Sequence, residues 1–162
     1  MTTTPKAGDV KSEVDGLAAT ARSASQFMAQ VVKLLHERML KYNWVGFYML
    51  EAVTGQPPVL VLGAFEGAMT PHTRIPLHQG ICGAAASSGR TVVVDDVSKD
   101  PRYLACSLET KSEIVVPVFA RGKVVGELDI DSHFHAAFKD EDRELVEYCA
   151  ALVGKQLEKS PA

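Results

Sequence analysis

Two long segments of the chain repeat apolar residues at steps of three and four, which is the spacing of an amphipathic helix. They cover residues 17–41 and 138–159, and Asp140 is a plausible N-cap for the second one. The stretch that precedes the first segment, residues 1–16, is polar and is predicted to be a flexible lead-in. We therefore expect one folded domain over residues 17–160, with a long helix near each of its ends.

Short runs of β-branched and aromatic residues, separated by turn residues, fill the middle of the chain and indicate strands. The predicted strands cover residues 44–50, 59–65, 91–97, 112–120 and 123–131. Small residues over 81–89 end at Gly89 and favour a short helix with a glycine cap, whereas residues 66–80 have no period and are predicted to be a loop.

The order of these elements predicts the fold class. Because the two long helices do not alternate with the strands, the chain is expected to be α+β, with helices grouped on a mostly antiparallel sheet. The sheet would have five to six strands, and the N- and C-terminal helices would pack together on it.

Composition narrows the class of protein. Hydrophobic residues make up 46% and charged residues 23% of the 162 positions, as in ordinary globular domains. A formal net charge of −3 argues against nucleic-acid binding, which would require a basic surface. No apolar run reaches the roughly eighteen residues that a membrane span requires. Three cysteines with no C-x-x-C pair argue for a reducing compartment, the cytoplasm, and against a disulfide framework.

Two of the three cysteines are candidates for chemistry. Cys106 lies in a polar, loop-like segment, which gives a thiol the access that reactive cysteines need, although a half-buried packing role is also compatible. Cys82 lies at the predicted start of the short helix, where the dipole lowers a thiol pKa, although its sequence context alone favours a buried packing role. Cys149 falls on the apolar stripe of the last helix and is predicted to be core.

Acidic residues interrupt two predicted strands, where they are unusual. Glu127, Asp129 and Asp131 are spaced by two, so they share one face of their strand. A two-residue turn between the last two strands would bring Glu113 to the same end as Asp131. Such a group is either a solvated face or an acidic pocket that binds a cation or donates a proton.

Aromatic residues and histidines complete the set of candidates. Trp44 and Tyr48 are four apart on the first strand and share a face, where they either form core or line a small apolar pocket. The histidines lie in predicted loops without a helical metal-binding spacing, so no metal site is predicted.

Four motifs, taken in this order, resemble the GAF-domain free methionine-(R)-sulfoxide reductases. They are NWVGFY, RIPLHQGICG, YLACSLETKSEIVVPV and VVGELDIDS, and the similarity covers about residues 25–157. The 24-residue spacing between Cys82 and Cys106 fits the family, as does the step of seven residues from Cys106 to Glu113.

The resemblance implies a GAF-like fold, often assembled as a homodimer, that reduces free methionine-(R)-sulfoxide without a bound cofactor. In that family pattern, Cys106 would attack the sulfoxide sulfur, and thioredoxin would supply the reducing equivalents. The substrate-binding residues implied by the resemblance are Glu113, Asp129 and Asp131 for the amine and for the proton to the sulfoxide oxygen, and Trp44 and Tyr48 for the S-methyl group.

One position departs from the family pattern. The family usually carries a third cysteine where this chain has His72, ten residues before Cys82. Cys82 is then the obvious thiol to convert a sulfenic acid at Cys106 into a disulfide, with direct reduction by a small thiol as another route. A non-catalytic GAF module that binds a small amine or senses a redox state is the alternative function.

Overall fold

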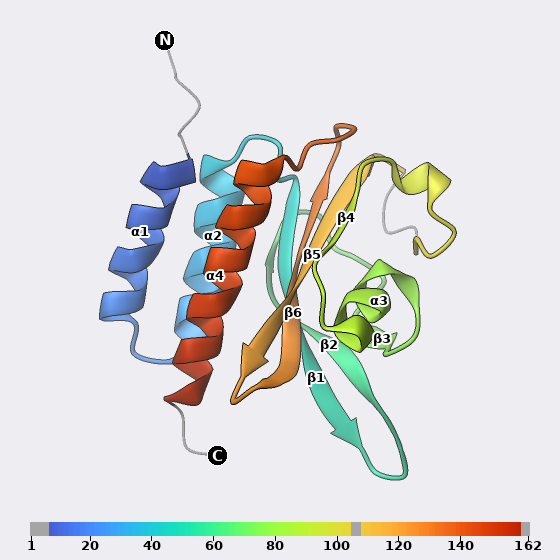
Figure 1. The fold of residues 1–162 in the computed structure, drawn as a ribbon, viewed down its shortest axis with the longest axis horizontal. Coiled ribbons are helices and arrows are strands. Elements are labelled where there is room, and N and C mark those ends of the chain that lie inside the picture. Colours follow the sequence, from blue (N-terminus) through green and yellow to red (C-terminus); the bar gives the residue numbers. More distant parts are fainter. Residues whose placement is uncertain (1–6, 105–107, 160–162) are drawn as a thin grey trace.

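The computed structural model describes residues 7–104 and 108–159, which form a six-stranded antiparallel sheet with helices on both faces (Figure 1). The strand order is β3-β2-β1-β6-β5-β4. The strands are β1 (Trp44–Val53), β2 (Gln56–Glu66), β3 (Arg74–Pro76), β4 (Val92–Val94), β5 (Ser112–Ala120) and β6 (Lys123–Ser132). The helices are α1 (Ala7–Thr20), α2 (Ala24–Arg38), α3 (Gly80–Ser88), α4 (Asp140–Glu158) and the short 3₁₀ helix η1 (Val97–Lys99). The predicted α+β class is confirmed.

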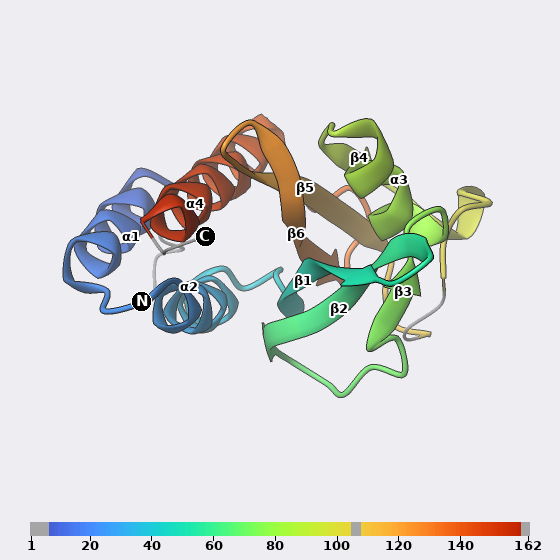
Figure 2. The same ribbon diagram turned by 90° about the horizontal axis from the view of Figure 1, so that it is seen from below.

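The sheet separates two layers of helices, with α1, α2 and α4 on one face and α3 on the other (Figure 2). Each face has its own apolar core. Phe27, Phe47 and Leu145 belong to the core on the three-helix side, and Leu60 and Ile81 belong to the core on the α3 side. None of the helices in the described part of the chain is long and apolar enough to span a membrane.

The N-terminal prediction is wrong for residues 7–16, which form most of α1 and not a flexible lead-in. Val10 and Val14 are fully buried against the other two helices of that face, and the Tyr148 hydroxyl donates a hydrogen bond to Asp15. Two valines four positions apart carry the buried stripe of this segment, so the apolar period is too sparse to stand out among polar residues.

The first predicted long helix, residues 17–41, is two helices. It is interrupted at Ser23, whose extended backbone and side chain form the N-cap of α2. The Ser23 hydroxyl accepts a hydrogen bond from the Gln26 amide at 3.0 Å. Because the apolar residues keep the same spacing on both sides of Ser23, the sequence pattern did not show that one helix ends and another begins there.

Two smaller features, the start of α4 and a short strand, also differ from expectation. Lys139 and not Asp140 is the N-cap of α4, and its amide donates to the Asp142 carboxylate at 2.9 Å. The segment 66–80, predicted to be a loop, contains the three-residue strand β3 paired with β2. A strand this short gives no alternating pattern of its own.

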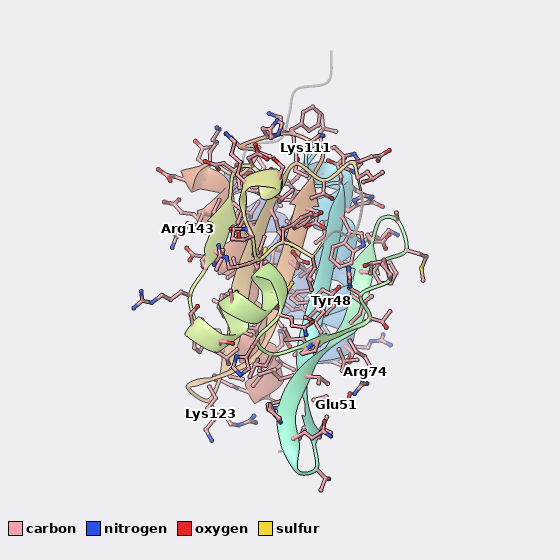
Figure 3. The ribbon with its side chains drawn as sticks, turned by 90° about the vertical axis from the view of Figure 1, so that its right-hand side faces the viewer. Tyr48, Glu51, Arg74, Lys111, Lys123 and Arg143 are labelled. Atoms are coloured by element: carbon pink, nitrogen blue, oxygen red, sulfur yellow. The ribbon has the colours of Figure 1, made fainter. Side chains whose placement is uncertain are left out.

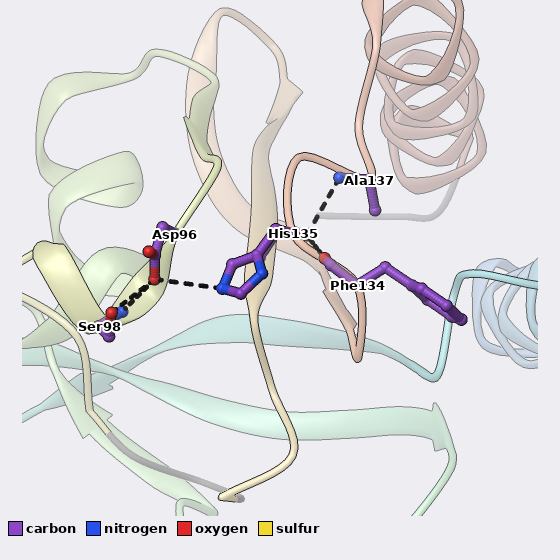
Figure 4. Close-up of polar contacts among 6 residues, drawn as sticks. Asp96, Ser98, Phe134, His135 and Ala137 are labelled. Atoms are coloured by element: carbon purple, nitrogen blue, oxygen red, sulfur yellow. Dashed lines mark hydrogen bonds and ion pairs between the residues drawn. The ribbon is translucent and has the colours of Figure 1, made fainter.

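The loop between β6 and α4 is fastened to neighbouring segments by polar contacts (Figure 4). The Ser112 hydroxyl donates to the Phe134 carbonyl at 2.6 Å and accepts from the Ala137 amide at 3.3 Å. His135 Nε2 lies 3.7 Å from Asp96 Oδ1 in the segment after β4. These contacts hold the first residue of β5 in place at the end of the sheet where the acidic residues gather.

Candidate functional site

Four carboxylates lie together on the α3 face of the sheet. Glu127, Asp129 and Asp131 alternate along the central strand β6, and Glu113 pairs with Asp131 across the β5–β6 ladder. Trp44 pairs with Asp131 from the other side, across β1–β6. All four carboxylates are at most 5% exposed, so they do not form a solvated face but a buried acidic cluster.

The electrostatics of this cluster favour the protonated state. Burial is the first cause that raises the pKa of all four carboxyl groups above the ordinary range. The charges of Asp129 and Asp131 add to the rise in the pKa of Glu113, whereas hydrogen bonding with Glu113 opposes the rise at both aspartates. Every cause at Glu113 thus raises its pKa, whereas the two aspartates have opposing causes.

Cys82 is the third residue of α3 and faces the same cluster. Its thiol donates a hydrogen bond to Asp129 Oδ2 at 3.4 Å. Burial and then the nearby charges of Asp129 and Glu127 raise its pKa well above the ordinary value. The prediction that the helix N-terminus lowers this pKa is therefore wrong, because desolvation and like charges outweigh the dipole.

The two glycines that flank Cys82 allow α3 to sit this close to its surroundings. Gly80 has φ +70°, and a Cβ there would lie 2.9 Å from the Leu104 side chain. A Cβ at Gly83 would lie 2.7 Å from the Leu77 carbonyl oxygen. Neighbouring segments therefore approach the backbone on either side of Cys82 more closely than a residue with a side chain would allow.

Trp44 and Tyr48 share one face of β1, as their spacing predicts, and both line the larger cavity described below. Their rings stack with centroids 6.2 Å apart. Trp44 Nε1 donates to the Ala68 carbonyl at 3.0 Å, and the Tyr48 hydroxyl donates to the His72 carbonyl at 2.7 Å. Both aromatic residues thus connect strand β1 to the segment between β2 and β3.

Two cavities open between these elements. The larger has a volume of about 130 Å³. It is lined by Asn43, Trp44, Tyr48, Ala68, Met69, Thr70, Glu109, Thr110, Asp129, Asp131 and His133. The smaller, of about 20 Å³, shares Tyr48 and Asp129 with the larger and is also lined by Cys82 and Glu113. The pair of cavities therefore joins the aromatic wall, the carboxylates and the Cys82 thiol.

The charged side chains that line the two cavities are mostly acidic. Among the described residues, no lysine or arginine lines either cavity. Figure 3 looks onto this face, with Tyr48 near the middle and the labelled Arg74, Lys123 and Arg143 toward its edges. A cavity with buried carboxylates and no lysine or arginine in its described lining suits a small ligand that carries a positive charge.

Cys106, the predicted nucleophile, lies outside the described residues. The chain that flanks it on both sides does reach the site, because Leu104 lines the smaller cavity and Glu109 lines the larger. Cys149 of α4, predicted to be core, is fully buried in the apolar core on the three-helix side. Burial raises its pKa to about 12.

Some residues in or beside the site were given no role by sequence reasoning. Glu127 was placed on the acidic face but given no role, and the alternation along its strand was the signal. Asn43 and His133 line the larger cavity and are joined by a hydrogen bond from the His133 amide to Asn43 Oδ1 at 2.7 Å. They lie at the ends of two strands whose pairing is not evident from local sequence.

The GAF domain is the class of protein that this fold and site define, and the model of that family matches residues 23–157 of the chain. A free methionine-R-sulfoxide reductase of Escherichia coli is 35% identical over 149 residues, covering 92% of this chain and 87% of the relative. A free methionine-R-sulfoxide reductase of Saccharomyces cerevisiae is 42% identical over 114 residues, covering 70% of this chain and 62% of the relative.

A solved structure gives the same result in three dimensions. The free methionine-R-sulfoxide reductase of Neisseria meningitidis, in complex with its substrate, superposes with a TM-score of 0.86 at 35% identity. The match covers 98% of this chain and 93% of that one. The chain therefore belongs to the family of GAF-domain free methionine-(R)-sulfoxide reductases.

Proposed function

We propose that this protein reduces free L-methionine-(R)-sulfoxide to L-methionine, with Cys106 as the nucleophile. The observation that carries the proposal is the cavity of about 130 Å³ that joins an aromatic wall to buried carboxylates. Membership of the reductase family adds weight to it. A cavity of similar size, about 150 Å³, holds a benzene molecule in another protein, so this one suits a single small molecule.

The two halves of the cavity match the two ends of this substrate. The ammonium group would be held by Asp129 and Asp131, which line the larger cavity. Glu113 lines the adjoining smaller cavity, from which it would supply a proton to the substrate. The S-methyl group would pack against the stacked Trp44 and Tyr48 rings. Placing a positive charge beside buried carboxylates offsets part of their mutual repulsion, so substrate binding and relief of charge strain occur together.

The first chemical step needs a thiolate and a proton. The Cys106 sulfur attacks the sulfoxide sulfur, and the S–O bond breaks as its oxygen passes to Cys106 as a sulfenic acid. Glu113 would protonate the sulfoxide oxygen, since burial and the charges of Asp129 and Asp131 raise its pKa and so favour the protonated carboxyl group. The products are methionine and a Cys106 sulfenic acid, so sulfur is reduced in the substrate and oxidised in the enzyme by two electrons.

Regeneration would use Cys82. Its sulfur attacks the Cys106 sulfenic acid, a disulfide forms, and the hydroxyl leaves as water. Asp129 already accepts the Cys82 S–H hydrogen bond and is positioned to take that proton. A thioredoxin dithiol would then reduce the disulfide. We retain a homodimer in the cytoplasm as the expected assembly and location.

A non-catalytic ligand-binding module is the second candidate, because Cys82 is buried with a raised pKa and His72 replaces the family's third cysteine. Turnover of free methionine-(R)-sulfoxide, followed as methionine released, separates the two. Cys106→Ser should abolish even a single turnover, whereas Cys82→Ser should release one methionine per enzyme and then recycle slowly with thioredoxin. Cys149→Ala removes a thiol away from the site and should recycle normally. Wild-type protein that yields no methionine with thioredoxin or dithiothreitol would refute the enzymatic function.

A further inference from the structure

Three side chains from three different elements converge beside the smaller cavity. The Cys82 sulfur from α3, a Glu113 oxygen from β5 and an Asp129 oxygen from β6 all lie within 4.8 Å of one another. All three residues are buried. A thiolate with two carboxylates is a ligand set that Zn²⁺ accepts, with a fourth position left for water.

Unpartnered buried oxygens give a second, independent observation. Asp129 Oδ1 and both oxygens of Glu127 are buried and have no hydrogen-bond partner of ordinary geometry within the described parts of the chain. Asp129 lines the smaller cavity, and Glu127 is close enough to the Cys82 thiol for each to shift the pKa of the other. Buried acceptors without donors are costly, so these oxygens are suited to a positively charged occupant.

The space fits a single ion. The cavity of about 20 Å³ exceeds the roughly 10–15 Å³ that one water molecule needs, and it has room for little more. Seven titratable side chains line this cavity or lie beside Cys82, Glu113 and Asp129. They are Tyr48, His72, Cys82, Glu113, Glu127, Asp129 and Asp131. None of them is a lysine or arginine, so within the described lining no positively charged side chain occupies this cavity.

We propose that Cys82, Glu113 and Asp129 form a binding site for a thiophilic divalent cation such as Zn²⁺, and that the bound ion inhibits the enzyme. The ion would bind the Cys82 sulfur as a thiolate and the two carboxylates as anions. Inhibition rests on the proposed function, since the ion would occupy carboxylates meant for the substrate amine and the thiol meant for Cys106.

Binding is testable without any turnover. Co²⁺ is the probe, because a cobalt–thiolate bond gives a charge-transfer absorption band in the near ultraviolet. In a Cys106→Ser background, which removes the other candidate thiolate, titration should give one band that saturates at one ion per chain. Adding Cys82→Ser should abolish the band, and adding Asp129→Asn should weaken Co²⁺ binding tenfold or more. Absence of the band in the Cys106→Ser protein, or its persistence after Cys82→Ser, would overturn the site.

A control addresses the other donor pair near the entrance. His133 Nε2 lies 3.5 Å from Glu109 Oε2 at the mouth of the larger cavity and could bind cations weakly. His133→Ala in the Cys106→Ser background should leave the cobalt–thiolate band and its affinity unchanged. An equal loss with His133→Ala would place the ion at the entrance and overturn the proposal.

Inhibition is tested separately on the protein with all its cysteines. Zn²⁺ should lower methionine release, and raising free methionine-(R)-sulfoxide should restore it, since both compete for Asp129. If wild-type protein binds Co²⁺ with the predicted band but makes no methionine, the site stands while the proposed function fails. If it makes methionine that saturating Zn²⁺ does not suppress, the inhibitory role is wrong.

Discussion

The two faces of β6 are buried to the same degree and filled with opposite chemistry. Leu128 and Ile130 turn toward the three-helix layer and are fully buried in its apolar core. Glu127 and Asp129, their immediate neighbours, turn toward α3 and are also almost fully buried. One strand therefore contributes to folding on one side and opposes it on the other, which indicates that the acidic face is retained for chemistry and not for stability.

The largest expected contrast comes from adjacent residues on the two faces. Ile130→Ala should reduce the free energy of unfolding by about 2–5 kcal/mol, because it removes buried methyl groups and leaves a cavity. Asp131→Asn should change stability much less while reducing methionine release. Urea denaturation and an activity assay on both variants measure the contrast. A similar loss of stability in both would mean that Asp131 is a structural residue.

Two glycines extend the same contrast. A Cβ at Gly154 in α4 would overlap the Phe119 backbone carbonyl, which cannot move aside, so Gly154→Ala should cost about 1–3 kcal/mol in stability. A Cβ at Gly46 in β1 would overlap the end of the Trp44 ring and would lie 3.0 Å from Phe65 Cβ, so it would displace the aromatic side chain that lines the cavity and not the backbone. Gly46→Ala should therefore raise KM for the sulfoxide more than it lowers stability. A loss of stability with an unchanged KM in Gly46→Ala would show that Trp44 does not contact the substrate.

The pH dependence of stability should reveal the acidic face directly. A carboxyl group whose pKa is higher in the folded than in the unfolded protein binds protons more tightly when folded, so stability falls as pH rises. The fall should begin near the ordinary pKa values of 3.8 for aspartate and 4.5 for glutamate and continue toward the raised pKa values of the cluster. A tenfold difference in proton affinity between the folded and unfolded protein corresponds to about 1.4 kcal/mol.

Glu127→Gln tests the origin of that fall. The variant should lose less stability between pH 4 and pH 8 than the wild type, because one buried ionisation is gone. Free energies of unfolding from urea titrations at several pH values provide the measurement. Parallel curves for the two proteins would show that Glu127 does not titrate across this range.

The smallest contrast involves two buried tyrosines. The Tyr48 hydroxyl donates to the His72 carbonyl on the site side, and the Tyr42 hydroxyl donates to Asp142 at 2.5 Å on the helix side. Each Tyr→Phe variant should lose about 0.5–1.5 kcal/mol in stability. Tyr48→Phe should also raise KM a few-fold, whereas Tyr42→Phe should leave KM unchanged. Equal KM values for Tyr48→Phe and Tyr42→Phe would show that the Tyr48 hydroxyl has no role in substrate binding.

The same contrast explains which parts of the structure could be predicted. The period of two along β6 was sufficient to place Glu127, Asp129 and Asp131 on one face, and the turn before β6 was sufficient to bring Glu113 beside Asp131. Helix α1 was not predicted, because its two buried valines depend on contacts with helices far away in sequence. The pKa of Cys82 was predicted in the wrong direction for a similar reason, since the carboxylates that raise it come from other elements.

The hydrogen bonds from Trp44 to Ala68 and from Tyr48 to His72 have a consequence for what can enter the site. They fix the segment between β2 and β3 at a set height above the sheet, so the compartment beneath it has a ceiling as well as a floor. If the protein has the proposed function, such a compartment would favour a free amino acid whose ammonium group lies among the carboxylates. A methionine sulfoxide within a polypeptide carries main chain on both sides, and the covering segment would hinder its entry.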